Sequence, residues 1–318
     1  MAGDWHQLWE IVSVPDNVPI VALLFVVPFY TWYAFKQAFA TDRLIVQLEA
    51  DPQLAKSSHR RIFPWKAGWD REVHVWPFLM RIEFLVAIIV TVILMVWSIT
   101  LNAPLEEPAN PNLTMNPAKA PWYFLGLQEM LVYFDPWIAG VVMPTIIIVG
   151  LMAIPYIDVN PLGNGYFTYR QRRIAIWTFL FGFIGLWTIM IIIGTFIRGP
   201  GWMWFWPTQT WDHSRLEFAV NVDLHAWGPF KYIVPQTAWG KGIFGALVVG
   251  LYTVVAAGAV HKLCMLTEFS RKIYARMTLL QIVTLQVLMI SMIALPVKML
   301  LRLALTIKYV WVTPWFNV

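Results

Sequence analysis

The chain has 318 residues, of which 59% are hydrophobic and only 13% are charged, and its mean hydropathy is +0.61. Soluble domains carry roughly 25% charged residues, so this composition excludes an ordinary soluble globular protein. The net charge of +5 would suit a nucleic-acid partner in a soluble chain. Here the basic residues follow a membrane pattern instead, so we expect contact with membrane lipids and no nucleic acid.

Six stretches are long and apolar enough to cross a bilayer. Crossing takes about 20 residues, because the hydrocarbon core is about 30 Å thick and a helix rises about 1.5 Å per residue. Backbone amides in lipid must be satisfied within the segment, which favours helices. The sequence therefore predicts an all-α integral membrane protein with about six transmembrane helices, at residues 18–39, 82–101, 138–157, 174–197, 242–260 and 278–297.

Lys and Arg gather in alternate connections between these helices. They are frequent after the first, third and fifth helices, and sparse in the N-terminal segment, the two long loops 102–137 and 198–241, and the C-terminal tail. Basic loops remain in the cytoplasm. This pattern predicts both termini on the outer side of the membrane, together with the two long loops.

The loop after the second helix contains a candidate site at residues 116–131. Pro121 suits the start of a short helix, where its missing N–H costs nothing. Trp122 and Glu129 are seven residues apart and so share one face, with Leu125 and Gly126 between them. Such a face predicts an apolar pocket with a single acid. The alternative is a re-entrant interfacial helix with a solvated Glu129.

Several motifs in this region resemble one protein family. Residues 120–125 read Ala-Pro-Trp-Tyr-Phe-Leu, after a proline-rich segment at 103–111 and before Ile-Pro-Tyr-Ile-Asp-Val-Asn-Pro at 154–161 and Phe-Ile-Arg-Gly-Pro-Gly-Trp at 196–202. Together they resemble the C-terminal half of cytochrome b, or subunit IV, of bacterial cytochrome bc-type complexes. In the family the first motif opens the outer quinol-oxidation loop. The sequence departs from the family at Pro121, which stands where the family has a glutamate that is commonly assigned as proton acceptor.

The resemblance implies three regions. Residues 1–73 would hold an extra transmembrane helix and a basic cytoplasmic loop. Residues 74–212 would form the cytochrome b C-terminal-like unit, from the second to the fourth helix. Residues 213–318 would add an outer loop and two further helices.

The resemblance also implies a function, that of a non-haem subunit of a quinol:cytochrome c oxidoreductase in a bacterial inner, energy-transducing membrane. The subunit would form part of the outer site for quinol, expected to be menaquinol, and of the proton exit. Its partners would be a four-helix haem-binding cytochrome b subunit and a Rieske-type iron–sulfur protein or c-type cytochrome. Glu129 would replace the missing family glutamate as catalytic proton acceptor. The expected quinol-binding residues are Pro121, Trp122, Tyr123, Leu125, Gly126, Gln128 and Met143.

Haem and metal sites are not expected on this chain. A b-type haem between helices needs inward-facing His ligands, and no His lies within the second, third or fourth predicted helix. The sequence also lacks a Cys-x-x-Cys-His motif for covalent haem. Haem b is therefore expected in the partner subunit, and His213 and His225 are interpreted as interface residues.

Two other functions remain open. The chain could be a redox-inactive membrane anchor that docks another oxidoreductase, an alternative that the loss of the family glutamate favours. A transporter is disfavoured, because charged residues at mid-membrane depth, which mark ion and substrate pathways, are nearly absent from the six helices.

Overall fold

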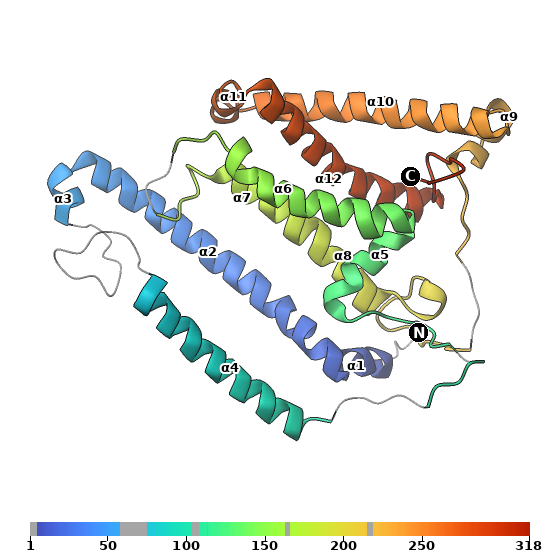
Figure 1. Cartoon of the computed structure of the whole chain (residues 1–318), viewed down its shortest axis with the longest axis horizontal. Helices are drawn as coiled ribbons and strands as arrows, with labels where there is room; N and C mark the ends of the chain where they lie inside the picture. The colour runs from blue at the N-terminus through green and yellow to red at the C-terminus, as the bar shows by residue number, and fades with distance from the viewer. Residues whose placement is uncertain (1–4, 58–74, 103–107, 113, 163–165, 215–218) are drawn as a thin grey trace. The chain divides into compact units, whose positions relative to one another are not determined.

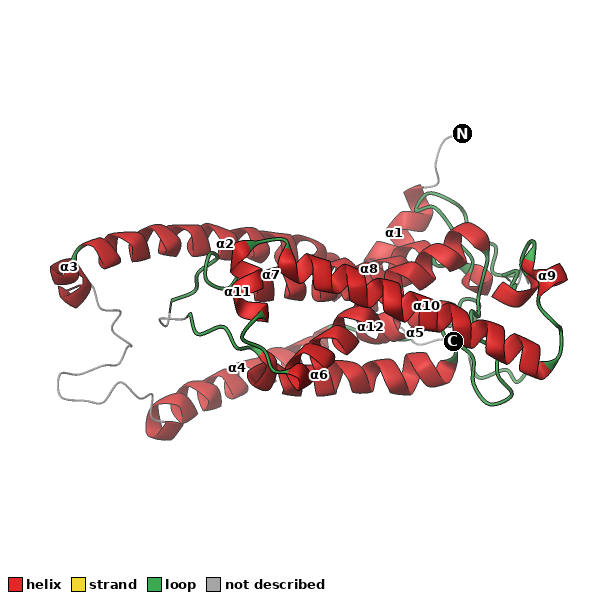
Figure 2. Cartoon of the chain, turned by 90° about the horizontal axis from the view of Figure 1, so that it is seen from above, coloured by secondary structure: helices red, strands yellow, loops and turns green. Residues whose placement is uncertain are grey.

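The computed structural model describes residues 5–57, 75–102, 108–112, 114–162, 166–214 and 219–318. These residues fold mainly as helices, joined by loops and a few isolated bridges between extended residues (Figure 2). The predicted fold class is confirmed. Six helices are long and apolar enough to cross a membrane, at Pro15–Ala50, Val75–Thr100, Ile138–Ile157, Arg173–Ile197, Ala238–Met265 and Leu279–Leu305.

The chain packs as two compact units. The first contains Met1–Phe25, Asn110–Gly165 and Arg170–Val318, and the second contains Val26–Ala109 and Tyr166–Tyr169. Compact packing thus divides the chain at other points than the boundaries 1–73, 74–212 and 213–318, which remain a prediction.

The second unit contains most of α2 (Val18–Ala50), α3 (Pro52–Ser57), the π-helical segment η2 (Val75–Leu79) and α4 (Met80–Thr100). None of the residues of α4 is buried by this chain. Its charged residues, Arg81 and Glu83, lie in the first turn, and the rest of the helix is uncharged, as suits a segment that spans hydrocarbon.

The first unit contains the core. Figure 1 shows α12 (Leu279–Leu305) between α10 (Ala238–Met265) and α6 (Met143–Ile157), and α12 contacts both. The third span consists of η4 (Ile138–Val142) and α6. The fourth is one continuous helix with two π-helical stretches, described as α7 (Arg173–Leu180), η5 (Phe181–Thr188), α8 (Ile189–Ile192) and η6 (Ile193–Ile197).

Short elements complete the first unit. Helix α11 (Glu268–Tyr274) and α12 both begin with capping boxes, from Thr267 and Thr278, which satisfy the free N–H groups of the first turn. The remaining elements are α1 (Trp5–Ser13), η1 (Pro15–Asn17), η3 (Trp122–Phe124), α5 (Leu125–Tyr133), η7 (Pro200–Trp202), η8 (Leu224–Ala226) and α9 (Phe230–Ile233).

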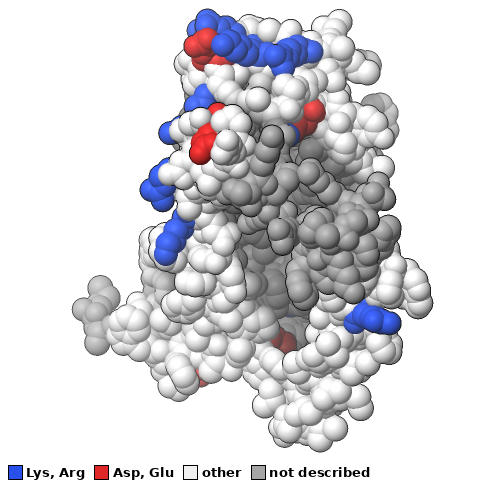
Figure 3. Space-filling view, turned by 90° about the vertical axis from the view of Figure 1, so that its left-hand side faces the viewer, with Lys and Arg blue, Asp and Glu red and all other residues white. Residues whose placement is uncertain are grey.

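The two ends of the first unit differ in charge. One end holds α11 and the turn before α7, where Arg173 lies 4.5 Å from the ring centroid of Phe269. Figure 3 faces the end that carries α11, and Lys and Arg side chains gather along its upper edge. The other end holds α1, α5, the loop after η6 and the C-terminal tail, which pairs with residues 222–224. This grouping of loops matches the alternation that the sequence predicts.

Candidate functional site

The candidate loop forms a short helix, as predicted, but it begins one residue later. Pro121 precedes η3 with φ −53° and ψ 147°, and its carbonyl accepts from Phe124 N at 2.8 Å. The side chain of Gln128 stabilises the turn before η3 with two hydrogen bonds to the backbone. Its Oε1 accepts from Ala120 N at 2.7 Å, and its Nε2 donates to Ala118 O at 2.7 Å. Gln128, predicted to bind quinol, therefore fixes the shape of the segment that precedes Pro121.

Helix α5 lies directly on the fourth span. A Cβ added at Gly126 would be 3.2 Å from the ring of Trp187, and one added at Gly194 would be 3.3 Å from Cβ of Leu125. The missing side chains let the two backbones approach closely. Leu125 is 1% exposed as a result, so Leu125 and Gly126 serve as the contact between α5 and the span.

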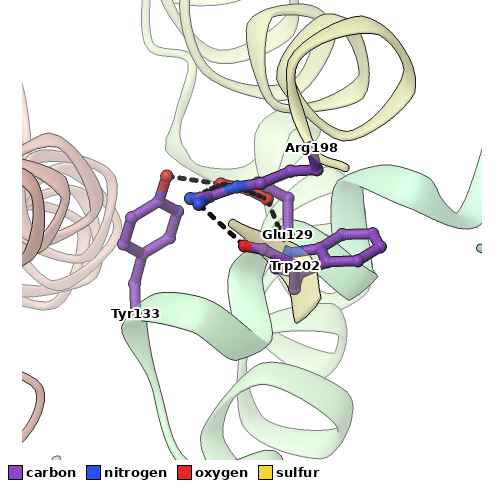
Figure 4. Close-up of polar contacts among 4 residues, drawn as sticks. All are labelled: Glu129, Tyr133, Arg198 and Trp202. Carbon is purple, nitrogen blue, oxygen red and sulfur yellow. Dashed lines mark hydrogen bonds and ion pairs between the residues drawn. The ribbon is translucent and has the colours of Figure 1, made fainter. Parts of the chain in front are cut away.

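Glu129 has no exposed surface and accepts hydrogen bonds from three residues (Figure 4). Arg198 binds it in a fork, with Nη2 to Oε1 at 2.7 Å and Nε to Oε2 at 3.0 Å. Tyr133 donates its hydroxyl to Oε1 at 2.6 Å, and Trp202 donates Nε1 to Oε2 at 3.1 Å. Glu129 is therefore neither solvated nor isolated in an apolar pocket.

Arg198 joins this network from the end of the fourth span. It also donates from Nη1 to Trp202 O at 3.1 Å, and its guanidinium lies 5.6 Å from the ring centroid of Trp204. Burial opposes the charge of Arg198, but the hydrogen bonds and charge of Glu129 outweigh it and raise the pKa of the guanidinium. Burial, followed by the charge of Glu129, likewise raises the pKa of Tyr133. The network therefore keeps Arg198 charged and Tyr133 protonated.

Asn116 ties the candidate loop to the next outer loop. Its side chain donates from Nδ2 to His213 O at 3.2 Å and accepts from Gly201 N at 2.5 Å, while its carbonyl lies 2.6 Å from His213 Nδ1. His213 thus links the two outer loops within this chain, and its interpretation as an interface residue stays a prediction. His225 is buried in η8, where burial lowers its pKa.

The predicted quinol-binding residues do not form one surface. Pro121 and Tyr123 are exposed, and Trp122 packs against the cluster of Ile191 and Phe196. Met143 instead packs against a second cluster, built around Met130 and Tyr133. Of the predicted quinol-binding residues, Pro121 and Tyr123 are the exposed ones.

Sequence reasoning missed several residues of this site: Arg198, Tyr133, Trp202 and Lys119. Arg198 carried the clearest signal, because a cation directly after an apolar span needs a partner, and Glu129 is one of the carboxylates in the preceding outer loop. Lys119 extends from the candidate loop to the fourth span. Its Nζ donates to Thr195 O at 2.8 Å and lies 4.7 Å from the ring centroid of Trp211.

Within the described residues, no group of three or more His, Cys, Asp or Glu side chains could hold a metal ion. His59 and His74 lie outside the described residues. The fold and site together define a class: a multi-pass membrane protein in which a short extramembrane helix is docked on the fourth span.

The comparison with known families is more specific. Residues 108–200 match the family model described as cytochrome b (C-terminal)/b6/petD. The resemblance noted from the motifs is confirmed over this segment, which contains the candidate loop and the third and fourth spans. The second span ends before the match begins. No curated protein and no solved structure matches the chain. The likeness to this family is therefore a property of the segment 108–200.

Proposed function

We propose that this chain is the membrane subunit of a quinol:cytochrome c oxidoreductase and forms part of its outer quinol-oxidation site and proton exit. One observation carries the proposal. The segment at 120–125 that resembles the family's quinol loop lies within the family match and is held on the fourth span. The hydrogen bonds of Gln128 within the loop and the ion pair of Glu129 with Arg198 give the loop a fixed shape. A specific ligand site requires such a fixed shape.

The proposal includes a division of labour with partner subunits. A four-helix cytochrome b subunit would hold haem b, and a Rieske-type iron–sulfur protein or c-type cytochrome would receive one electron at the outer site. The quinol would be menaquinol and the membrane the bacterial inner membrane, with both termini of this chain outside. Basic residues are dense in the connections after the first, third and fifth spans and sparse in the other connections, which supports this orientation.

Photoaffinity labelling with a quinone analogue tests the proposal in the purified complex. We expect labelling of residues 116–131 that excess quinol prevents. Tyr123→Ala should weaken the labelling, because Tyr123 is 52% exposed beside Pro121. Tyr232→Ala is the matched control, since Tyr232 is 87% exposed on α9. Labelling that quinol does not prevent would refute the site.

The redox-inactive anchor is the second candidate, and one observation favours it. Proline replaces the family glutamate, while Glu129 is already bound by three residues. An anchor would keep the docked loop for a protein partner and offer no quinone site. The labelling experiment separates the two functions, because only the first gives quinol-protected labelling.

A further inference from the structure

Lys119 lies two residues before Pro121, and its side chain is partly buried. Its amine crosses from the candidate loop to the fourth span, where it donates to Thr195 O, and it lies on the face of Trp211. Trp211 and Trp122 pack against the same apolar cluster, of Ile191 and Phe196. The amine therefore lies beside the part of the loop that resembles the quinol site.

The carbonyl of Thr195 needs a hydrogen-bond donor from outside its own helix. Thr195 lies in η6, at the end of the fourth span, where helix carbonyls lose their ordinary partners. Gly199 N–H donates to Met203 O instead, and Pro200 has no N–H to offer. Lys119 supplies the missing hydrogen bond. A neutral amine supplies it equally well, since it keeps two N–H groups and has a free lone pair.

The surroundings bring the titration of the amine close to neutral pH. Burial lowers the pKa of Lys119 to about 7, and the negative charge of Glu129 opposes that shift. A pKa near the working pH suits a group that accepts and releases protons. The charged and titratable groups on the elements around the amine are Glu129 and Tyr133 on α5, Arg198 after η6, Asp212 and His213 beside Trp211, and His6 and Glu10 on α1.

We propose that Lys119 accepts the first proton from quinol at the outer site, in the role that Pro121 removes from the family position. This inference rests on the proposed function. The lone pair of the Lys119 amine takes a hydroxyl proton, so that one O–H bond breaks, one N–H bond forms and a quinolate anion remains. The anion then gives its electron to the high-potential one-electron carrier of the partner subunit. The lysine ammonium later loses its proton to the outer side.

Lys119→Arg is the decisive variant in the assembled complex. Arginine keeps a donor for Thr195 O and a cation beside Trp211, but it stays charged at every pH because it cannot be deprotonated in a protein. The wild-type rate of quinol oxidation should rise with pH through about 7, because the amine is a base only when neutral. In Lys119→Arg that rise should be absent and the rate at pH 8 at least about tenfold lower, with quinol-protected labelling unchanged. Lys231→Arg, at an exposed lysine of α9, should behave as wild type.

Two results would overturn the inference. A wild-type rate and pH profile in Lys119→Arg would show that the side chain is only a donor to the span. Lys119→Met provides a second check, because it should also remove the rise with pH. Independently, the rate of acetylation of the Lys119 amine can be followed against pH by mass spectrometry, with half-reactivity expected near pH 7; half-reactivity near the ordinary lysine value of 10.5 refutes the base.

Failure of the proposed function has a different signature. A wild-type complex that oxidises no quinol and shows no protected labelling refutes that function, and with it the role of Lys119 toward quinol. The acetylation profile would still report whether the amine titrates near neutrality.

Discussion

Glu129 and Arg198 depend on each other because both are buried. The exposed fraction of the side chain is 6% for Arg198 and 0% for Glu129. Removing one partner of a buried pair leaves an uncompensated charge, which typically costs about 3–5 kcal/mol, whereas replacing both by apolar residues costs much less. The pair therefore contributes more to the position of the loop than to net stability.

A double-mutant cycle tests this dependence. Arg198→Met and Glu129→Leu should each lower the free energy of unfolding by about 3–5 kcal/mol. The double variant should lose clearly less than the sum of the two single losses. Thermal unfolding of the subunit in detergent measures all four forms, and additive losses would show that the two side chains do not interact.

Glu129→Gln addresses the predicted role of Glu129 as proton acceptor. Glutamine keeps the shape but removes the charge: with Glu129 as the acceptor, quinol oxidation should slow at least about tenfold at every pH, whereas with Lys119 as the acceptor only the pH dependence should change. The charge of Glu129 raises the pKa of Lys119 against burial, so its removal lowers that pKa. The midpoint of the pH–rate profile should then move to lower pH. Disappearance of the pH dependence would instead favour Glu129 itself as the acceptor.

At the scale of elements, the candidate site depends on how α5 sits on the fourth span. Gly126 allows the contact because a Cβ there would meet Trp187 at 3.2 Å. The same contact brings Glu129 within reach of Arg198 and lets Lys119 reach Thr195 O. The close contact between α5 and the fourth span therefore makes possible both the ion pair of Glu129 with Arg198 and the hydrogen bond of Lys119 to Thr195 O.

Gly126→Leu should separate α5 from the span, since overpacking a tight contact costs about 1–3 kcal/mol. Hydrogen exchange of the α5 amides should rise, and quinol oxidation should fall with it. Gly140→Leu is the matched control, because a Cβ at Gly140 meets nothing within 4 Å. If the α5 amides exchanged hydrogen at the same rate in the two variants, the contact at Gly126 would not be what holds α5 on the span.

The helices were more predictable than the site. Composition alone locates the third span, Ile138–Ile157, because hydrocarbon selects an uninterrupted apolar run. Helix α2 continues to Ala50, well past the predicted 39, since polar residues also form helix once they leave the membrane. The π-helical stretches of the fourth span and the short helix α1 carry no comparable signal. The carboxylate of Glu129 was predicted to matter, but its partner lies 69 residues away, and local patterns do not report such pairings.

At the scale of the whole molecule, the alternation of basic loops predicts six spans with both termini outside. An enzyme that is active only in the cytoplasm should show no activity when it is fused to the C-terminus. Strong activity of the fusion would contradict the predicted orientation. The same enzyme inserted after α11, at the basic end of the first unit, should be active and so serves as the positive control.

The haem prediction also concerns the whole molecule. The purified chain, separated from its partners, should show no Soret band, because the described transmembrane helices offer no paired histidines at mid-membrane depth. His261 lies near the end of α10, where its Nδ1 is 3.3 Å from the hydroxyl of Tyr274. A Soret band that stays with this polypeptide would contradict the prediction and would place a haem ligand on this chain.

The ion pair between α5 and the fourth span has a consequence for biosynthesis. Glu129 leaves the ribosome 69 residues before Arg198, an interval of about 3 to 14 s at ordinary rates of translation. During that interval the carboxylate of Glu129 has no guanidinium to neutralise it in its buried position, so it stays in water. The loop can therefore close over the membrane only after the fourth span has been inserted with Arg198 on the same side. A nascent chain whose fourth span enters in the wrong direction leaves the loop open and accessible to quality-control proteases.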